Sequence, residues 1–445
     1  MNELTPSMAL QFVKENDVKF VRLNFCDIFG FQKNISIMAN ELESAFKEGI
    51  SFDAHVIRGF RDITQSDLFL FPDPSTLAVL PWRPGPGRVI RFFCEIKTPN
   101  AAGYADAPFE HDTRMILKKV TERAQRMGYV CKIGAECEFY LFKTNENGEP
   151  SDITLDRGSD MDISPLDKGE DIRREICLTL QEMGIRPESS HHEQGPGQNE
   201  IDFKFDDAVA SADNLQTFKT VVKAIAARNG LFASFMPKPL LDAPGNGMHI
   251  NLSLYQNGKN IFKDENESLS KTAESFIAGI LDKIREITLF LNPLANSYER
   301  LGKFEAPKYV SWSYQNRSQL VRIPAASGDN VRMELRSPDT SLNPYLAFAL
   351  IISAGLDGIE NNACLPPAVD EDLYTADSGV TNALSRLPDT LEDVIKVAEN
   401  SNFIKNIIGG NLLSKYIEIK KTEAEEFAAS EDKAKYYKER FFNVY

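Results

Sequence analysis

Five short segments of the sequence hold carboxylate, imidazole and guanidinium side chains, mostly at alternate positions with an apolar residue between them. They span residues 136–138, 192–193, 200–204, 249–253 and 332–336, and read ECE, HE, EIDFK, HINLS and RMELR. Side chains two residues apart on a β-strand share a face, so each strand would separate its polar groups from its apolar ones. One face of a sheet would then concentrate carboxylates.

The same alternation is typical of an antiparallel sheet with one solvated face, which is the simpler interpretation of any single segment. The five segments together favour another interpretation, because they concentrate Glu at spacings where like charges repel one another. A hard divalent cation such as Mg2+ or Mn2+ would relieve this repulsion, since both prefer oxygen ligands. Five glutamates and one histidine suffice to bind two metal ions.

The composition limits the classes of protein to which the chain can belong. The chain has 445 residues, of which 42% are hydrophobic and 26% charged, so we expect a large core and two domains. The net charge of -15 argues against nucleic acid and anionic membranes as partners, although acidity that merely aids solubility explains it equally well. The six cysteines form neither a CxxC pair nor a zinc-binding spacing, which favours reduced thiols.

No segment of the sequence directs the protein to a membrane or out of the cell. The apolar stretch at 346–356 is too short to span a bilayer, which requires about 20 residues, and we expect a buried helix there. Residues 1–16 include acidic side chains where a signal peptide would be basic and then apolar. We therefore expect a cytoplasmic protein.

The order of the predicted elements indicates an α+β protein. Residues 18–98 are rich in strands, and 98–108 resemble a linker because they hold two prolines and few large apolar residues. We therefore expect a small sheet domain at 1–103 and a larger domain at 104–445 whose antiparallel sheet bears the acidic face. Helices are predicted at 111–127, 211–229, 269–291 and 344–358, the second ending at Gly230.

Arginines are concentrated in the last part of this larger domain. Positions 300, 317, 322, 332 and 336 are all Arg. Guanidinium groups match phosphate and carboxylate oxygens, and metal ions beside arginines are the usual means of stabilising phosphoryl transfer. Surface ion pairing is the alternative. The chain has no G-x-x-x-x-G-K-[ST] motif and no G-x-G-x-x-G after a strand, so the common nucleotide-binding folds are not indicated.

Longer motifs follow one another in a specific order. They are HHE and GPGQNEIDFKF within 191–205, FMPKPL at 235–240, GNGMH at 245–249, NSYERL at 296–301, EAP at 305–307, NRSQLVRIP at 316–324 and RMELRSPDTSLNPYLAFA at 332–349. In this order they resemble type I glutamine synthetase, in its shorter non-adenylylated subtype, over nearly the whole chain. The resemblance implies a β-grasp-like N-terminal domain, a catalytic domain, and a dodecamer of two hexameric rings with active sites between subunits.

The resemblance also implies roles for individual residues. One metal ion would be bound by Glu138, Glu193 and Glu200, and the other by Glu136, His249 and Glu334. Glutamate would be bound by Arg300, Arg336, Gly245 and Glu193, and ATP by Arg317, Arg322, Ser253, Asn251 and Phe205. The catalytic residues would be Arg317, Asp53 from the neighbouring subunit, and Glu305, which would close over the site.

The implied reaction joins ammonia to L-glutamate. ATP would convert the γ-carboxylate, a poor electrophile, to γ-glutamyl phosphate, and ammonia would displace the phosphate to give L-glutamine, ADP and phosphate. Two or more Mg2+ or Mn2+ ions and the arginines would neutralise the developing charge. Ammonium has no lone pair, so Asp53 would accept its proton, and Glu305 would exclude water from the intermediate.

Departures from the family pattern gather around the substrates. The family's DGSS is here DAHV at 53–56, Asp160 aligns with a tyrosine of the ammonium pocket, NGSGMH is PGNGMH, and the flap at 300–307 is one residue shorter. Apolar Ala54 and Val56 beside an extra acid would suit an alkylamine or polyamine, giving a γ-glutamyl-amine ligase. We favour lineage drift around an unchanged reaction, because Asp53, Glu305 and all six metal positions are retained.

Two further points concern regulation. A non-catalytic regulatory homologue would have eroded ligands, whereas all six metal positions and four matching arginines are present in this chain. A nitrogen-regulatory protein is a partner that the resemblance suggests and that no motif identifies.

Overall fold

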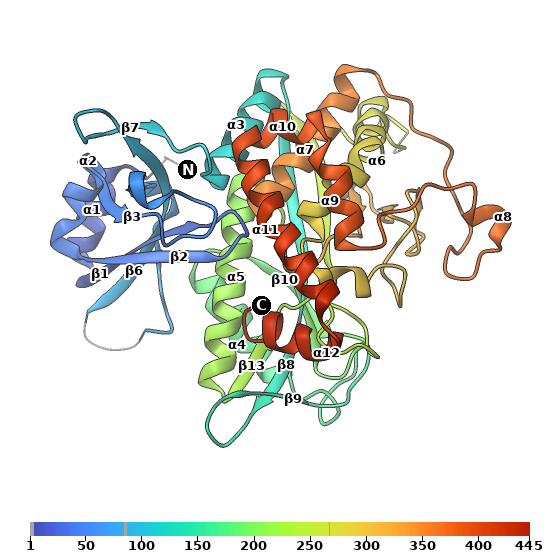
Figure 1. Ribbon diagram of the computed structural model, residues 1–445, viewed down its shortest axis with the longest axis horizontal. Helices are drawn as coiled ribbons and strands as arrows, with labels where there is room; N and C mark the ends of the chain where they lie inside the picture. Colours follow the sequence, from blue (N-terminus) through green and yellow to red (C-terminus); the bar gives the residue numbers. More distant parts are fainter. Residues whose placement is uncertain (1–3, 84–86, 267) are drawn as a thin grey trace.

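Two β-sheets, one near the N-terminus and one in the remainder of the chain, organise the computed structural model (Figure 1). The structure describes residues 4–83, 87–266 and 268–445. The first three residues of the segment considered for a signal peptide therefore lie outside the described part. Among the described residues, no helix is both long and apolar enough to cross a membrane.

The N-terminal sheet has seven strands in the order β2-β1-β6-β4-β3, with β5 and β7 also paired to β6. They are β1 (Val18–Cys26), β2 (Gln32–Met38), β3 (Ile50–Asp53), β4 (Asp67–Pro72), β5 (Ala78–Val79), β6 (Arg88–Pro99) and β7 (Ala105–Pro108). Strands β1 and β6 are parallel, and the other pairs are antiparallel. Helices α1 (Pro6–Glu15) and α2 (Leu42–Lys47) lie beside this sheet in Figure 1. The predicted β-grasp-like domain is confirmed.

The linker expected at 98–108 is wrong. Strand β6 continues to Pro99, and β7 turns back to pair with it, so that Lys97 faces Pro108 and Pro99 faces Ala105. A strand that pairs on one side only tolerates proline and small residues, because its other side needs no ladder hydrogen bonds. The domain boundary proposed after residue 103 falls within this hairpin.

The larger sheet has eleven strands, and its antiparallel character was predicted. Its main path is β10-β11-β8-β14-β18-β17-β16, with β9, β12 and β13 also on β8 and β15 on β14. The strands are β8 (Val130–Thr144), β9 (Pro150–Thr154), β10 (Pro187–His192), β11 (Gln198–Phe203), β12 (Asp206–Asp207), β13 (Leu231–Ser234), β14 (Met248–Gln256), β15 (Lys259–Asn260), β16 (Trp312–Tyr314), β17 (Val321–Ile323) and β18 (Met333–Leu335). Among the described strands of this larger sheet, only β16 and β17 pair in parallel.

The four predicted helices of the larger domain are present with small shifts at their ends. Its helices are α3 (Thr113–Arg126), α4 (Glu170–Glu182), α5 (Ala208–Arg228), α6 (Lys271–Leu291), α7 (Pro344–Glu360), α8 (Ser378–Thr381), α9 (Leu391–Glu399), α10 (Asn402–Ile408), α11 (Gly410–Ala429) and α12 (Lys433–Tyr437). Asp112 caps α3, and Gly230, at φ +69°, follows the end of α5. Helix α7 is buried throughout 346–356, as its apolar sequence predicted.

Short helical turns complete the chain. They are 3-10 turns at Ala39–Glu41, Ile63–Gln65, Pro74–Thr76, Ala295–Glu299 and Gly328–Asn330, and a π turn at Lys438–Phe442.

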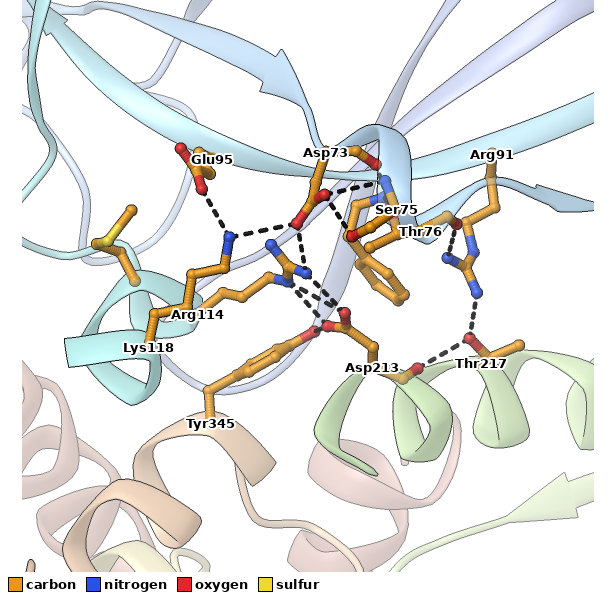
Figure 2. A network of polar contacts seen from close by, with 12 residues as sticks. Asp73, Ser75, Thr76, Arg91, Glu95, Arg114, Lys118, Asp213, Thr217 and Tyr345 are labelled. Carbon is orange, nitrogen blue, oxygen red and sulfur yellow. Dashed lines mark hydrogen bonds and ion pairs between the residues drawn. The ribbon is translucent and has the colours of Figure 1, made fainter. Parts of the chain in front are cut away.

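A buried polar network joins the two domains (Figure 2). The guanidinium of Arg114 on α3 lies 2.8 Å from a carboxylate oxygen of Asp213 on α5 and 3.0 Å from one of Asp73 in the N-terminal domain. The hydroxyl of Tyr345 on α7 donates to Asp213 at 2.7 Å, and Lys118 contacts Asp73 at 3.2 Å. Three helices of the larger domain therefore meet the N-terminal domain through one set of charges.

Candidate active site

Strand register places the acidic residues in rows across the larger sheet. Glu138 on β8 lies opposite Glu200 on β11, and Glu136, two residues earlier, lies opposite Asp202 on one side and His249 on the other. Residues directly opposite each other in an antiparallel pair have Cβ atoms only about 5 Å apart. The alternation seen in the sequence therefore becomes a continuous acidic surface over three strands.

Glu136, His249 and Glu334 form one compact group. Their nearest ligand atoms all lie within 4.8 Å of one another. The His249 Nδ1 atom is 3.3 Å from Glu136 and 3.5 Å from Glu334. Burial opposes ionisation of Glu136, but the hydrogen bond and charge of His249, with the amide of Asn251, lower its pKa to about 2. Two carboxylates and an imidazole on three strands make a donor set suited to a divalent metal ion.

Arginines surround this group. Glu334 is wholly buried, and its two oxygens accept hydrogen bonds from Arg322 and, at 2.8 Å, from Arg336. Arg336 also donates to the main-chain oxygen of Glu305 at 3.3 Å, whereas the Glu305 side chain is 62% exposed. Arg300 is buried and donates to main-chain oxygens of the segment that follows β18. The site thus combines acidic and guanidinium groups within a few ångströms.

A second group shares His249 with the first and extends across β8 to β11. Ligand atoms of Glu138, Glu200 and His249 lie within 4.8 Å of one another. Glu193, which follows the end of β10 instead of lying on a strand, faces the same cavity with an oxygen 2.8 Å from His191 Nε2. Burial and the charge of Glu193 raise the pKa of Glu138 to about 8, and burial and neighbouring carboxylates raise that of Glu200 well above its usual range. Positive charge at this point would relieve the repulsion.

Sequence reasoning missed two participants in this second group. Gln198 is fully buried and donates to Glu138 at 2.7 Å, and His191 lies in a cluster with Glu200 and Asp202. Gln198 precedes Glu200 by two positions on β11 and so shares its face. The same alternation that identified the carboxylates would have found the amide, had uncharged polar residues been counted.

The groups open into one cavity of about 440 Å³. Ten of the predicted site residues line it: Glu136, Glu138, Glu193, Glu200, Gly245, His249, Arg300, Glu305, Arg317 and Arg322. Glu334 and Arg336 lie behind its wall. A side chain at Gly245 would place its Cβ 2.4 Å from the Pro237 oxygen, so only glycine fits where this loop approaches the cavity.

The three remaining predicted nucleotide residues line an adjoining cavity of about 550 Å³. They are Phe205, Asn251 and Ser253. Both cavities share Glu136 and Asp202 as lining residues, so they meet at the acidic surface. Arg332 belongs to the arginine group noted in the sequence but received no individual assignment. It lines this adjoining cavity and donates to Asn251 at 2.8 Å.

Asp53 is the one predicted site residue that lies elsewhere in this chain. It ends β3 in the N-terminal sheet, where a carboxylate oxygen is 2.7 Å from His55 Nδ1 and accepts a hydrogen bond from the His55 main chain. It lines neither cavity of the described residues. Ala54 is buried and Val56 is 67% exposed, so neither forms an amine pocket within one chain.

Asp160 and Met161, in contrast, do line the acidic cavity. Their loop is attached to β10 by a hydrogen bond from the Met161 N–H to the His192 oxygen at 2.9 Å. Burial, followed by the charges of Glu193 and Glu305, raises the pKa of Asp160. An acid therefore does stand at the wall of the cavity, as the alignment of Asp160 indicated.

Comparisons with known proteins cover nearly the whole chain. Residues 17–99 match the family described as "Glutamine synthetase, beta-Grasp domain", and residues 110–438 match "Glutamine synthetase, catalytic domain". Glutamine synthetase of Clostridium saccharobutylicum is 44% identical over 432 residues, covering 96% of each chain. That of Methanosarcina mazei is 44% identical over 430 residues, covering 96% of this chain and 95% of its own.

Solved structures with a similar fold cover nearly the whole chain as well. One named "GmaS/ADP complex-Conformation 1" has a TM-score of 0.86 and 30% identity, covering 99% of both chains. Another, "Apo GmaS without ligand", has a TM-score of 0.85 at 30% identity and covers 97% of this chain and 98% of its own.

Proposed function

Because the chain belongs to the glutamine synthetase family and is an ATP-dependent glutamate–ammonia ligase, we propose that the acidic cavity of its larger sheet is the active site. The observation that carries this proposal is the convergence of Glu136, His249 and Glu334 from three strands, with two arginines on Glu334. The family uses ATP and divalent metal ions, and the carboxylate and imidazole donors present fit such ions.

We assign one metal ion to Glu136, His249 and Glu334, and the other to Glu138, Glu193 and Glu200. The first assignment is supported by ligand atoms within 4.8 Å of one another. The second is supported by the raised pKa values of Glu138 and Glu200, which indicate carboxylates held together against their repulsion. When bound, such ions supply Lewis acidity and positive charge to the transferring phosphoryl group. Mg2+ and Mn2+ both suit these ligands.

ATP would bind in the cavity that contains Phe205, Asn251 and Ser253, with its phosphates toward the shared residue Glu136. Phe205 is 40% exposed, which leaves its ring available to an adenine base. Arg317 and Arg322 line the acidic cavity and would contact the phosphates. Arg332 joins this set as a nucleotide contact, because it lines the same cavity as Ser253.

Glutamate would bind at the opposite end, where Arg300 and Gly245 line the cavity. Arg300 is buried and presents a fixed positive charge to a carboxylate, and Arg336 holds the main chain of Glu305 at 3.3 Å. The exposed Glu305 side chain is then free to close over the substrate and keep water from the acyl phosphate. Holding the γ-carboxylate close to the ATP γ-phosphate would account for much of the rate enhancement.

Asp53 would act on ammonium in the active site of a neighbouring subunit. It lies at the exposed end of β3 and does not line the acidic cavity of its own chain, so a second copy must bring it there. The family resemblance further suggests a dodecamer of two hexameric rings, a cytoplasmic location and a nitrogen-regulatory protein as partner. The six cysteines, all without a disulfide, are compatible with the cytoplasm.

Ammonia is favoured over a larger amine as acceptor. The curated glutamine synthetases of two organisms are each 44% identical to this chain over nearly its whole length. Asp160 at the cavity wall is the one local feature that suits an alkylammonium ion.

An isotope experiment tests the acyl phosphate directly. Glutamate labelled with 18O in its γ-carboxylate is converted with ATP, Mg2+ and ammonium, and the released phosphate is analysed by mass. One 18O atom per phosphate supports γ-glutamyl phosphate, since the carboxylate oxygen that attacks ATP leaves with the phosphate. Unlabelled phosphate alongside glutamine would contradict it.

A further inference from the structure

A further cavity, separate from the two at the active site, lies between the N-terminal sheet and helix α5. It measures about 320 Å³, within the usual range for small-molecule sites, and shares no lining residue with the two active-site cavities. Four cationic side chains line it: Arg22 from β1, Arg91 from β6, and Lys219 and Lys223 from α5. No Asp or Glu side chain lines it among the described residues, although the whole chain has a net charge of -15.

Three of these four cations donate hydrogen bonds to neutral groups. Arg91 is buried and donates to the Thr76 main chain at 2.9 Å and to the Thr217 hydroxyl at 2.7 Å (Figure 2). Lys219 donates to the Thr340 oxygen at 2.6 Å, and Lys223 to the Val444 oxygen at 3.1 Å. Within the described part of the chain, none of the four lies within ion-pair distance of a carboxylate.

The carboxylates near the cavity have other partners. Asp213, whose charge acts on Arg91, lies 2.8 Å from the guanidinium of Arg114. Asp339, whose charge acts on Lys219, accepts hydrogen bonds from Ser341 and Asn292. The main-chain oxygen of Tyr445 accepts one from the Phe235 N–H at 3.1 Å. Burial lowers the pKa of Arg91 to about 10, and the charge of Asp213 opposes part of this shift. Buried positive charges that have no carboxylate within ion-pair distance are unfavourable, and a bound anion would stabilise them.

A neutral side chain gives a separate indication that the cavity binds a ligand. Asn24 on β1 lines the cavity and is nine-tenths buried, yet its side-chain oxygen has no hydrogen-bond partner. Buried amides are normally satisfied, so an unpartnered one indicates a missing partner. The two ends of an amide are interchangeable by rotation, and the alternative orientation would place its NH2 group, a donor, at the buried position of the oxygen.

We propose that this cavity binds a small, multiply charged oxyanion, a metabolite carrying phosphate or carboxylate groups, between the two domains. Lys223, which reaches solvent, would receive the anion at the mouth, and Arg22, Lys219 and Arg91 would surround it deeper in the cavity. Since Arg22 and Arg91 belong to the N-terminal sheet and the lysines to α5, the ligand would bridge the two domains.

Calorimetric titration of the full-length protein tests this proposal. The protein is kept in a chloride buffer free of metal ions and titrated separately with inorganic phosphate, succinate and citrate. The active site also attracts anions, so Arg317→Ala serves as background. Removing one cation, in Lys223→Met or Arg22→Met, should weaken binding of the best probe by about tenfold or more. Lys396→Met, an exposed lysine on α9, is the matched control.

The outcomes are distinct. Binding that persists in Arg317→Ala and Lys396→Met and weakens in both cavity variants supports the proposal, and the preferred probe separates phosphate from carboxylate ligands. Binding of none of the probes, or binding unchanged by Lys223→Met and Arg22→Met, overturns it. Trp82 lines the cavity, so quenching of its fluorescence by the bound probe gives a second readout. Unaltered circular dichroism and ligase turnover of the cavity variants show that they are folded.

Discussion

Glu136 and His249 lie directly opposite each other on β8 and β14, with the His249 Nδ1 atom 3.3 Å from a Glu136 oxygen. Glu334 reaches the same imidazole from β18 at 3.5 Å. Three residues that are far apart in the sequence thus form one potential metal site through strand register alone. The predictions below test this site, its neighbours and the contact between the domains.

Replacing Glu136 by Gln should abolish tight binding at this metal site. The change keeps the side-chain volume but removes a charge that faces His249, so we expect turnover to fall by about 100-fold or more. The rise in Tm that Mn2+ gives the wild type should shrink as well. Calorimetric scans with and without Mn2+, together with a turnover assay, measure both effects. Glu122→Gln, on the exposed surface of α3, should change neither.

Substitutions at Arg332 and at Arg300 should weaken the binding of different substrates. Arg332 lines the cavity assigned to ATP, and Arg300 lines the one assigned to glutamate. We expect Arg332→Met to raise the KM for ATP by about tenfold and leave that for glutamate nearly unchanged, and Arg300→Met to do the reverse. Steady-state kinetics with each substrate varied in turn makes each variant the control for the other. Equal effects of each variant on both KM values would refute the assignment of the two cavities to different substrates.

Glu305→Gln should uncouple ATP use from amide formation. Its exposed side chain stands at the cavity, beside Arg336, where closure would exclude water from the acyl phosphate. The ratio of ADP to glutamine formed should rise above one in the variant. Glu299→Gln, which removes a 2.9 Å ion pair with Lys303 in the same region, should keep the ratio at one. An unchanged ratio in both would show that Glu305 has no part in excluding water.

Asp73→Asn should destabilise the contact between domains in a pH-dependent manner. Burial opposes ionisation of Asp73, but the charge of Arg114, the Ser75 hydrogen bond and the charge of Lys118 lower its pKa from 3.8 to about 2. The unfolded chain binds this proton more readily, so the stabilisation is complete above about pH 4 and is lost as pH falls toward 2. A lowering of the Asp73 pKa from 3.8 to about 2 corresponds to between about 2 and 3 kcal/mol of stability.

The Tm of Asp73→Asn should therefore lie several degrees below that of the wild type at pH 7, and the difference should narrow at pH 3. Asp17→Asn removes an exposed ion pair with Lys19 and should leave the Tm unchanged. A difference in Tm that is as large at pH 3 as at pH 7 would mean that the Asp73 charge is not its source.

The spacing of residues in the sequence predicted the strands that hold the site residues better than it predicted the contacts between those strands. Glu136, Glu138 and Glu200 lie on strands as their alternation indicated, because side-chain direction in a strand follows from sequence spacing alone. Glu193 lies just past β10, where the chain bends into the cavity. The linker at 98–108 was wrong because an edge strand tolerates the residues that usually mark a linker.

Other contributions to the site depend on distant contacts. Arg332 could not be assigned to the nucleotide cavity, since its approach to Asn251 depends on the pairing of β14 with β18. Likewise, the hydrogen bond that links Gln198 to Glu138 depends on β11 pairing with β8. The role of Asp53 cannot be tested within one chain, because this residue would act in the active site of a second copy.

The most direct test of the account is the product formed by the purified protein from glutamate, ATP and Mg2+ with different nitrogen donors. Ammonium, methylamine, ethanolamine and putrescine are compared by kcat/KM, and each product is identified by mass. We predict the highest kcat/KM for ammonium, with L-glutamine as product, so that Asp160, Ala54 and Val56 are tolerated changes. A clearly higher value for an amine, with a γ-glutamylamide as product, would contradict the account and make Asp160 part of an amine pocket.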